Sequence, residues 1–296
     1  MSLIVDPVVA WFAQNARPLP WRDPHCSPWG VLVSEVMLQQ TPVVRVEPRW
    51  REWMALWPTP ADLAAAGTAE VLRAWDRLGY PRRALRLHQC ARVVVDRHDG
   101  ELPTAEADLL ALPGVGTYTA AAVTAFAHGR RAVVVDTNVR RVLARALTGT
   151  ALPAPSLTAA EMRAAGSVVP AGDLASTRWN AAVMELGALV CTARSPRCGV
   201  CPIADACAWR LAGMPADAHA HRRRRQTWAG TDRQVRGRVM ALLRSADHPL
   251  PVHLLEEVSA DAEQRERALA GLVRDGLVVR HEDPATDDAV SYRLPD

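Results

Sequence analysis

The spacing of apolar residues predicts a helical body for this chain. Apolar side chains recur three and four positions apart in alanine-rich stretches, which is the period of an amphipathic helix. The clearest of these stretches are residues 62–74, 81–95 and 117–127. Proline and glycine separate them, and the one clear strand-like run in this part, residues 132–135, is short. We therefore expect an all-α fold for the body of the chain.

The C-terminal residues 232–296 have a different pattern. It predicts three helices and then two strands, at residues 233–244, 251–255, 262–275, 277–280 and 290–293. This order is typical of a winged-helix domain, which usually binds DNA through a basic recognition helix. Because these residues carry a net charge of −4, we favour a protein-docking or packing role for them. Residues 214–231 contain four consecutive arginines and are predicted to be a basic linker, either a solvated tether or a phosphate contact.

The composition favours a folded protein that meets a polyanion. Hydrophobic residues make up 49% of the 296 residues, and no apolar run approaches the length of a membrane span. The start of the chain lacks the basic segment of a signal peptide, so we expect a cytoplasmic protein without membrane contact. Residues 1–231 carry a net charge of +7, which suits nucleic acid. All 35 cationic residues are arginine, so no lysine amine can form a Schiff base.

Four cysteines near residue 200 form the most specific motif. Cys191, Cys198, Cys201 and Cys207 are spaced C-x6-C-x2-C-x5-C, so one short loop carries four thiolates. Sets of this kind hold either a [4Fe–4S] cluster or a structural zinc. Zinc sites usually pair two C-x2-C knuckles, whereas this loop has one, so we favour the cluster. A disulfide fits less well, because disulfides are rare in the cytosol.

A tight turn separates two helical stretches at Leu112, Pro113, Gly114, Val115 and Gly116. The turn would expose backbone N–H groups at the start of the next helix, where the helix dipole also favours anions. Such a hairpin suits DNA phosphates and reads no base sequence. The simpler alternative is an ordinary turn between helices.

Asp136 stands twenty residues beyond this turn. It ends the apolar run and precedes a helical stretch, which is the usual place of an N-cap residue. The helix N-terminus would also keep the carboxylate ionised, so capping and a catalytic role are compatible.

The hairpin, the aspartate and the cysteine loop in combination resemble the helix-hairpin-helix DNA glycosylase superfamily, over about residues 10–212. The resemblance is to its iron–sulfur branch, which contains endonuclease III and the MutY-type adenine DNA glycosylases. Endonuclease III-type enzymes carry a strand-cleaving lysine just after the hairpin, where this chain has Thr117 and Tyr118. The sequences RPLPWR, SEVMLQQT and LGY, at residues 17–22, 34–41 and 78–80, instead look like adenine-glycosylase signatures.

This resemblance implies a domain order. The expected parts are an iron–sulfur cluster lobe at 1–28 and 132–213, a six-helix barrel lobe with the hairpin at 29–131, the basic linker 214–231, and a winged-helix-like module at 232–296. The module replaces a Nudix-like domain that helps many relatives to recognise 8-oxoguanine, which puts strong selectivity for this base in doubt. The implied partner is double-stranded DNA containing an adenine mispair, bound by a monomer associated with the nucleoid. Residues 232–296 would be available to a protein partner.

The resemblance also implies roles for individual residues. Glu35 would protonate adenine N7, and Asp136 would stabilise the sugar cation or form a transient covalent adduct, supported by Tyr118 and Asn138. The residues expected to contact the substrate or the DNA are Trp21, Arg22, Leu38, Gln39, Gln40, Tyr80, Leu112, Gly114, Val115 and Gly116. Of these, Gln40 would intercalate at the lesion. Tyr80 would wedge beside the opposing base, where its simpler role is a capping aromatic.

The chemistry of Glu35 can be argued without the resemblance. Cleaving an N-glycosidic bond needs a proton on the leaving base and a carboxylate beside an oxocarbenium-like sugar. Glu35 lies in the apolar helical stretch 31–38, where desolvation favours the protonated acid. A partly exposed helix glutamate is the alternative. Two positions depart from the family pattern, Thr137 in place of a frequent glycine and Pro81 in place of a second tyrosine, and we expect Thr137 to be tolerated.

These observations lead to one hypothesis and two alternatives. We expect a base-excision-repair glycosylase that removes adenine opposite 8-oxoguanine or guanine, without lysine-dependent strand cleavage. A mismatch thymine or uracil glycosylase of the same superfamily is the first alternative, and the SEVMLQQT signature around Glu35 argues against it. The second is a cluster-containing DNA-binding protein without catalytic activity.

Overall fold

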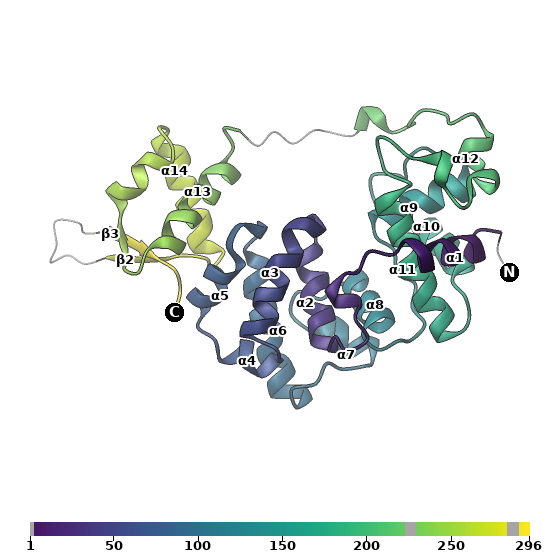
Figure 1. Cartoon of the computed structure of the whole chain (residues 1–296). Coiled ribbons are helices and arrows are strands. Elements are labelled where there is room, and N and C mark those ends of the chain that lie inside the picture. Colours follow the sequence, from purple (N-terminus) through teal and green to yellow (C-terminus); the bar gives the residue numbers. More distant parts are fainter. Residues whose placement is uncertain (1–2, 223–228, 283–289) are drawn as a thin grey trace. The chain divides into compact units, whose positions relative to one another are not determined.

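The computed structural model describes residues 3–222, 229–282 and 290–296, and the body of the chain is helical as predicted (Figure 1). The chain divides into two compact units. The first contains residues 1–32, 104–110 and 115–225, and the second contains residues 33–103, 111–114 and 226–296. Most of the predicted arginine run and the loop between the last two strands lie outside the described residues. In the part that is described, no helix has both the length and the apolar character needed to cross a membrane.

The first unit is organised around the long helix α11. Its α-helices are α1 (Val5–Asn15), the start of α2 (Pro28–Leu38), α7 (Glu106–Ala111), α8 (Thr117–Phe126), α9 (Thr137–Leu143), α10 (Ala159–Val168), α11 (Asp173–Leu189) and α12 (Ala208–Leu211). Its short 3-10 and π-helical turns are η1 (Pro20–Arg22), η3 (Ala144–Thr148), η4 (Cys198–Val200), η5 (Ala204–Ala206) and η6 (Ala220–Arg222). Helices α1 and α9 pack on α11, and Val8, Val139, Trp179, Val183 and Leu186 are buried between them.

The strand-like run at residues 132–135 forms no strand in the structure. Within the described residues it belongs to no sheet, which agrees with the helical body expected from the sequence. The carbonyl oxygen of Ala132 instead accepts hydrogen bonds from Asn180 Nδ2 at 2.9 Å and Ser176 Oγ at 3.3 Å, both on α11. Val134 is buried against the small residues of α8. The apolar run is therefore a buried connection that leads into α9.

The second unit begins with the end of α2 and continues through a group of helices. These are α3 (Val43–Leu56), α4 (Pro60–Ala65), α5 (Thr68–Trp75), the 3-10 turn η2 (Asp76–Leu78) and α6 (Arg82–His98). Helix α6 packs on α4 and α5, and the ring of Trp53 lies 4.9 Å from that of Trp57 and 5.3 Å from that of Trp75. The single helix predicted at 62–74 is wrong, because extended backbone at Gly67 separates α4 from α5.

The C-terminal module belongs to the second unit. Its elements are α13 (Asp232–Ser245), β1 (Leu250–Pro251), η7 (Val252–Val258), α14 (Ala262–Arg274), β2 (Val279–Glu282) and β3 (Val290–Arg293). The strands form an antiparallel sheet in the order β1-β3-β2, with Leu250 opposite Tyr292 and Val279 opposite Arg293. The predicted second helix is a 3-10 helix, and the two-residue strand β1 was not predicted. The assignment as a winged-helix domain stays a prediction.

Candidate active site and cysteine loop

Asp136 is the N-cap of α9, as predicted. Its Oδ1 accepts a hydrogen bond from the backbone N–H of Val139 at 2.7 Å, and its Oδ2 accepts one from Asn138 Nδ2 at 2.8 Å. Burial raises the pKa of Asp136, while the donors on Val139 and Asn138 and the charge of Arg141 oppose that rise. Thr137 begins α9 with helical backbone, so this position does not require glycine. Both oxygens of Asp136 are thereby fixed in place.

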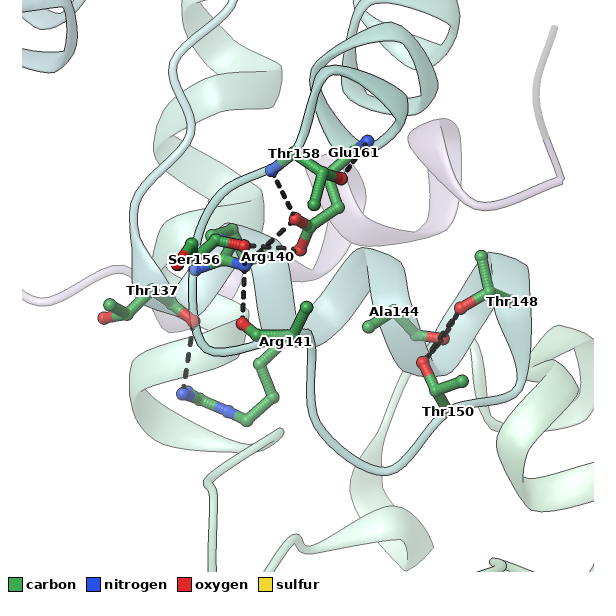
Figure 2. A network of polar contacts seen from close by, with 10 residues as sticks. Thr137, Arg140, Arg141, Ala144, Thr148, Thr150, Ser156, Thr158 and Glu161 are labelled. Carbon is green, nitrogen blue, oxygen red and sulfur yellow. Dashed lines mark hydrogen bonds and ion pairs between the residues drawn. The ribbon is translucent and has the colours of Figure 1, made fainter. Parts of the chain in front are cut away.

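Helix α9 is anchored to α10 by Arg140 (Figure 2). The guanidinium of Arg140 binds the carboxylate of Glu161 at 2.8 to 3.0 Å, and it donates to the carbonyl oxygens of Ala154 and Ser156 at 2.8 Å. Glu161 also belongs to the capping box that Thr158 forms at the start of α10. One arginine therefore ties the helix that carries Asp136 to a second, independently capped helix.

Arg141 links α9 to the end of α11 and to the cysteine loop. Its guanidinium is buried and donates to Asn138 Oδ1 at 2.8 Å, to Gly187 O at 2.7 Å and to Cys191 O at 2.6 Å. Asn138 in turn donates to Asp136, so hydrogen bonds run without interruption from the candidate catalytic carboxylate to the first cysteine residue. Gly187 makes this approach close, because a Cβ there would lie 2.7 Å from the Cβ of Asn138.

The four predicted ligands, Cys191, Cys198, Cys201 and Cys207, line one cavity. Apolar side chains from α9, α11 and α12 complete its wall, and they would exclude water from a bound group. Among the described residues, no three His, Cys, Asp or Glu side chains are gathered tightly enough to hold a single metal ion. Four thiols on one loop are the ligand set of an iron–sulfur cluster.

Arginines surround the first cysteine of this loop. Arg145 Nη1 lies 3.3 Å from the sulfur of Cys191 and 2.8 Å from the carbonyl oxygen of Thr192, and its guanidinium is 4.5 Å from the ring of Trp209. Burial raises the pKa of Cys191, while the charges of Arg145 and Arg141 oppose that rise. These cations favour the thiolate form that cluster iron requires. The residues present therefore fit an iron–sulfur cluster.

Trp21 and Arg22 lie in η1, and a buried carboxylate holds this segment on α11. Glu185 Oε1 accepts from the Arg17 backbone N–H at 3.0 Å and from Arg17 Nε at 2.8 Å, and Arg22 Nη2 binds Oε2 at 3.0 Å. Burial alone would raise the pKa of Glu185, but the two arginines outweigh it and hold the pKa at about 2. Nη1 of Arg22 is buried and has no hydrogen-bond partner within the described residues. The guanidinium carbon of Arg22 lies 5.3 Å from the centre of the Phe12 ring.

The hairpin lies between α7 and α8, as predicted. Gly114 has a left-handed φ of 82°, and a Cβ there would lie 3.0 Å from the Cβ of Arg86. Both the backbone conformation and the close contact therefore favour glycine at this position. Leu112 and Val115 are buried, and Gly116 is the N-cap of α8. Tyr118, in the first turn of α8, packs against a small apolar cluster formed by α8 and Val134.

Glu35 lies on α2 in the second unit and is buried as expected, with 5% of its surface exposed. Leu38 ends the helix, and the next residues are progressively exposed: Gln39 is partly buried and Gln40 is exposed. Gln40 has a left-handed φ of 56° and Tyr80 one of 48°. Non-glycine residues adopt this conformation rarely, and such strain is concentrated at functional sites. The two residues expected to enter the DNA helix therefore share an unusual backbone.

Arg83 supports both of these turns, and no local pattern in the sequence identified it. Its Nη1 donates to Gln39 O at 2.5 Å and to Val36 O at 2.9 Å, while its Nη2 donates to Gly79 O at 3.1 Å. The first and third carbonyls immediately precede the left-handed residues Gln40 and Tyr80. Sequence reasoning also missed Arg141, Arg145, Glu185 and Gly187, whose roles depend on contacts between distant segments.

Comparison with known proteins agrees with this geometry. Residues 33–166 match the family of HhH-GPD superfamily base excision DNA repair proteins, and residues 191–207 match the iron–sulfur binding domain of endonuclease III. The cysteine loop is therefore the binding site of a [4Fe–4S] cluster. The chain is 51% identical to an adenine DNA glycosylase of Mycolicibacterium smegmatis, over 96% of this chain and 95% of that protein. It is 50% identical to one of Mycobacterium tuberculosis, over 93% of this chain and 90% of that protein. A solved structure of a thermostable thymine-DNA glycosylase is 28% identical, with a TM-score of 0.63, and covers 70% of this chain and 95% of that one.

Proposed function

Because the chain belongs to the family of adenine DNA glycosylases, it binds DNA and hydrolyses N-glycosidic bonds in base excision repair, and we propose that its substrate is adenine mispaired with 8-oxoguanine or guanine. The observation that carries this proposal is the match to adenine glycosylases along nearly the whole chain. The likeness to a thymine-DNA glycosylase is weaker, at 28% identity, and is restricted to 70% of the chain. A thymine or uracil mismatch activity is accordingly less favoured.

The proposed reaction divides the work between two carboxyl groups. Glu35, buried on α2, is the general acid that protonates N7 of adenine, since burial favours the neutral acid. Asp136 faces the opposite demand, because a negative charge must meet the developing sugar cation. Burial raises the pKa of Asp136, and the donors on Val139 and Asn138 and the charge of Arg141 oppose this rise by favouring the charged form. Each of its oxygens can accept more than one hydrogen bond and so can still approach the sugar.

Trp21, Arg22 and Leu38 are proposed to contact the target adenine. Support comes from the buried Nη1 of Arg22, a donor that has no partner among the described residues and would gain one from an acceptor atom of adenine. Tyr118 and Asn138 hold the carboxylate site. The adenine would reach these residues only after it has left the duplex.

The proposed enzyme is monofunctional. Strand cleavage by the lysine-dependent route needs an amine that forms a Schiff base with the sugar, and all 35 cationic side chains of this chain are arginine. Thr117 and Tyr118 occupy the positions just after the hairpin. We propose that it acts as a monomer in the cytoplasm, in association with the nucleoid that contains its substrate.

In the proposed DNA complex, the hairpin residues contact phosphates and the turns of Gln40 and Tyr80 enter the base stack. Leu112, Gly114, Val115 and Gly116 bring backbone N–H groups to the start of α8, which has the dipole that phosphates prefer. Support comes from the exposure of both side chains and from the left-handed backbone that Gln40 and Tyr80 share. Gln39 would contribute to the same surface.

The test is a base-release assay with duplexes that differ only in the opposing base. Adenine should be released opposite 8-oxoguanine and guanine, and an abasic product should remain uncut until alkali is added. Glu35→Gln and Asp136→Asn should each lower release by about 10²–10⁴-fold while leaving DNA binding intact. Asparagine is as good an N-cap as aspartate, so the second variant should fold normally. The exposed Glu101→Gln is the matched control, and release of thymine or uracil without adenine would refute the proposal.

A further inference from the structure

The C-terminal module contacts the turn that carries Tyr80. Arg233, in the first turn of α13, has its guanidinium carbon 4.4 Å from the centre of the Tyr80 ring. This distance is well within the range of a cation–π interaction. Both residues belong to the second unit, and 38% of the surface of Tyr80 stays exposed. The ring is therefore held on its turn while part of it faces solvent.

Several other contacts join the module to the same region of the second unit. Asp275, which follows α14, binds Arg82 at 3.3 Å and also pairs with Arg236 of α13. Arg73, on α5, donates to the carbonyl oxygen of Ala246 at 3.1 Å. The module is therefore bound to α5 through the carbonyl oxygen of Ala246 and to α6 through the carboxylate of Asp275.

A second arginine, close to Tyr80 in the sequence, also contacts its ring. Arg83 has its guanidinium 5.4 Å from the ring, and it also donates to Gly79 O at 3.1 Å. The backbone of this turn is therefore fixed by α6, whereas the ring is also contacted by α13. Arg83 also bonds to the backbone of the turn, whereas Arg233 reaches the ring from α13, so replacing Arg233 leaves the hydrogen bonds of Arg83 in place.

We propose that Arg233 is a positioning residue for Tyr80, and that the module 232–296 contributes through it to recognition of the base opposite the target adenine. This inference rests on the proposed function, in which Tyr80 lies beside that base. An exposed tyrosine can adopt several rotamers, and a guanidinium on its ring favours one of them before DNA arrives. The ordered ring is then a preformed platform on which the opposing base stacks.

The experiment measures single-turnover adenine release from two duplexes, with 8-oxoguanine or guanine opposite adenine. Arg233→Met keeps the length of the side chain but removes the charge, and Arg233→Lys keeps the charge. The control is Arg280→Met, which removes a charge from the same module at an arginine paired with Glu282 on the same strand. Arg233→Met should reduce the preference for 8-oxoguanine over guanine roughly fivefold, the size of one cation–π contact. Arg233→Lys should restore part of it, and Arg280→Met should have no effect.

A double-mutant cycle separates positioning from a general contact with DNA. In a Tyr80→Leu background, Arg233→Met should cause no further loss of preference, because its ring partner is gone. An equal loss of rate on both duplexes, persisting in the Tyr80→Leu background, would show a phosphate contact and overturn the inference. An unchanged preference in Arg233→Met would overturn it as well. If the wild-type protein releases no adenine from either duplex, the proposed function itself fails, which is a different result.

Discussion

The close approach of α11 to the start of α9 can be tested by adding one methyl group. In Gly187→Ala, the new Cβ would lie 2.7 Å from the Cβ of Asn138 and 3.0 Å from its carbonyl oxygen. Carbon atoms in contact prefer about 3.5 Å or more, so the two segments must separate by about 0.8 Å. The neighbour is backbone and Cβ, which cannot rotate away as the end of a flexible side chain would. The displacement therefore reaches Asn138 directly.

The expected effect on activity exceeds the effect on stability. Overpacking costs about 1–3 kcal/mol, and replacing a glycine within a helix returns up to about 1 kcal/mol, so the free energy of unfolding should fall by about 0–2 kcal/mol. Asn138 donates to Asp136 and accepts from Arg141, so its displacement moves the carboxylate. A misplacement near 1 Å can cost about 10²-fold in rate, and we expect adenine release to slow by about 10–100-fold.

The assay is single-turnover adenine release at saturating enzyme, together with thermal unfolding of the same preparations. Gly166→Ala is the matched control, because the nearest atom to its new Cβ is Val133 Cγ2 at 3.9 Å, an ordinary contact. This control should be as active as the wild type and slightly more stable. The reasoning is refuted if Gly187→Ala retains the wild-type rate, or if its rate falls only in proportion to the fraction of folded protein.

Two further predictions concern the buried polar groups of the first unit. Arg141→Gln should lower both adenine release and iron content, because Arg141 donates hydrogen bonds to Asn138 and to Cys191 O. The iron content and the release rate are measured on the same preparation. The exposed Arg163→Gln is the control. Full iron content and full activity in Arg141→Gln would contradict the link. The ion pairs of Glu185 should make the free energy of unfolding fall as the pH drops from about 4.5 to about 2. In the unfolded chain the Glu185 carboxylate takes up a proton near pH 4.3, whereas in the folded protein it stays ionised down to about pH 2. The free energy of unfolding should therefore decrease by about 3 kcal/mol over this range. Acid unfolding of Glu185→Gln should lack this component, and an identical acid profile for both proteins would refute it.

The sequence predicts those parts of the site that have a local signature. Asp136 sits between an apolar run and a helix, so its capping role can be read from its neighbours, and the structure confirms it. The cysteine spacing and the L-P-G-V-G turn are equally local. The apolar run before Asp136 contains strand-like residues, but such a pattern alone does not show whether the run pairs in a sheet. In the structure the carbonyl oxygen of Ala132 accepts hydrogen bonds from two side chains on α11, so the run is a buried connection.

The parts that the sequence did not reveal are mostly arginines that bridge distant segments. Arg83 joins the carbonyls of Gln39 and Gly79, which are forty residues apart, and Arg141 joins Asn138 to Cys191 O. The residues that flank Arg83 and Arg141 do not distinguish them from the other arginines among the 35 in the chain. The role follows from the guanidinium itself, which has five N–H donors in a planar fork and so reaches several carbonyls at once.

The absence of lysine thus has two separate consequences in this chain. It removes the amine needed for strand cleavage by the lysine-dependent route, and it leaves every buried cationic position to a side chain with several donor atoms. An ammonium at Arg83 would carry all its donors on one nitrogen atom, whereas here Nη1 binds Gln39 O and Nη2 binds Gly79 O. The turns of Gln40 and Tyr80 are consequently coupled through one rigid group. Because the guanidinium is planar, a shift of the Gln40 turn strains the hydrogen bond to the Tyr80 turn, and the reverse also holds. The two residues proposed to enter the DNA therefore belong to one hydrogen-bonded element.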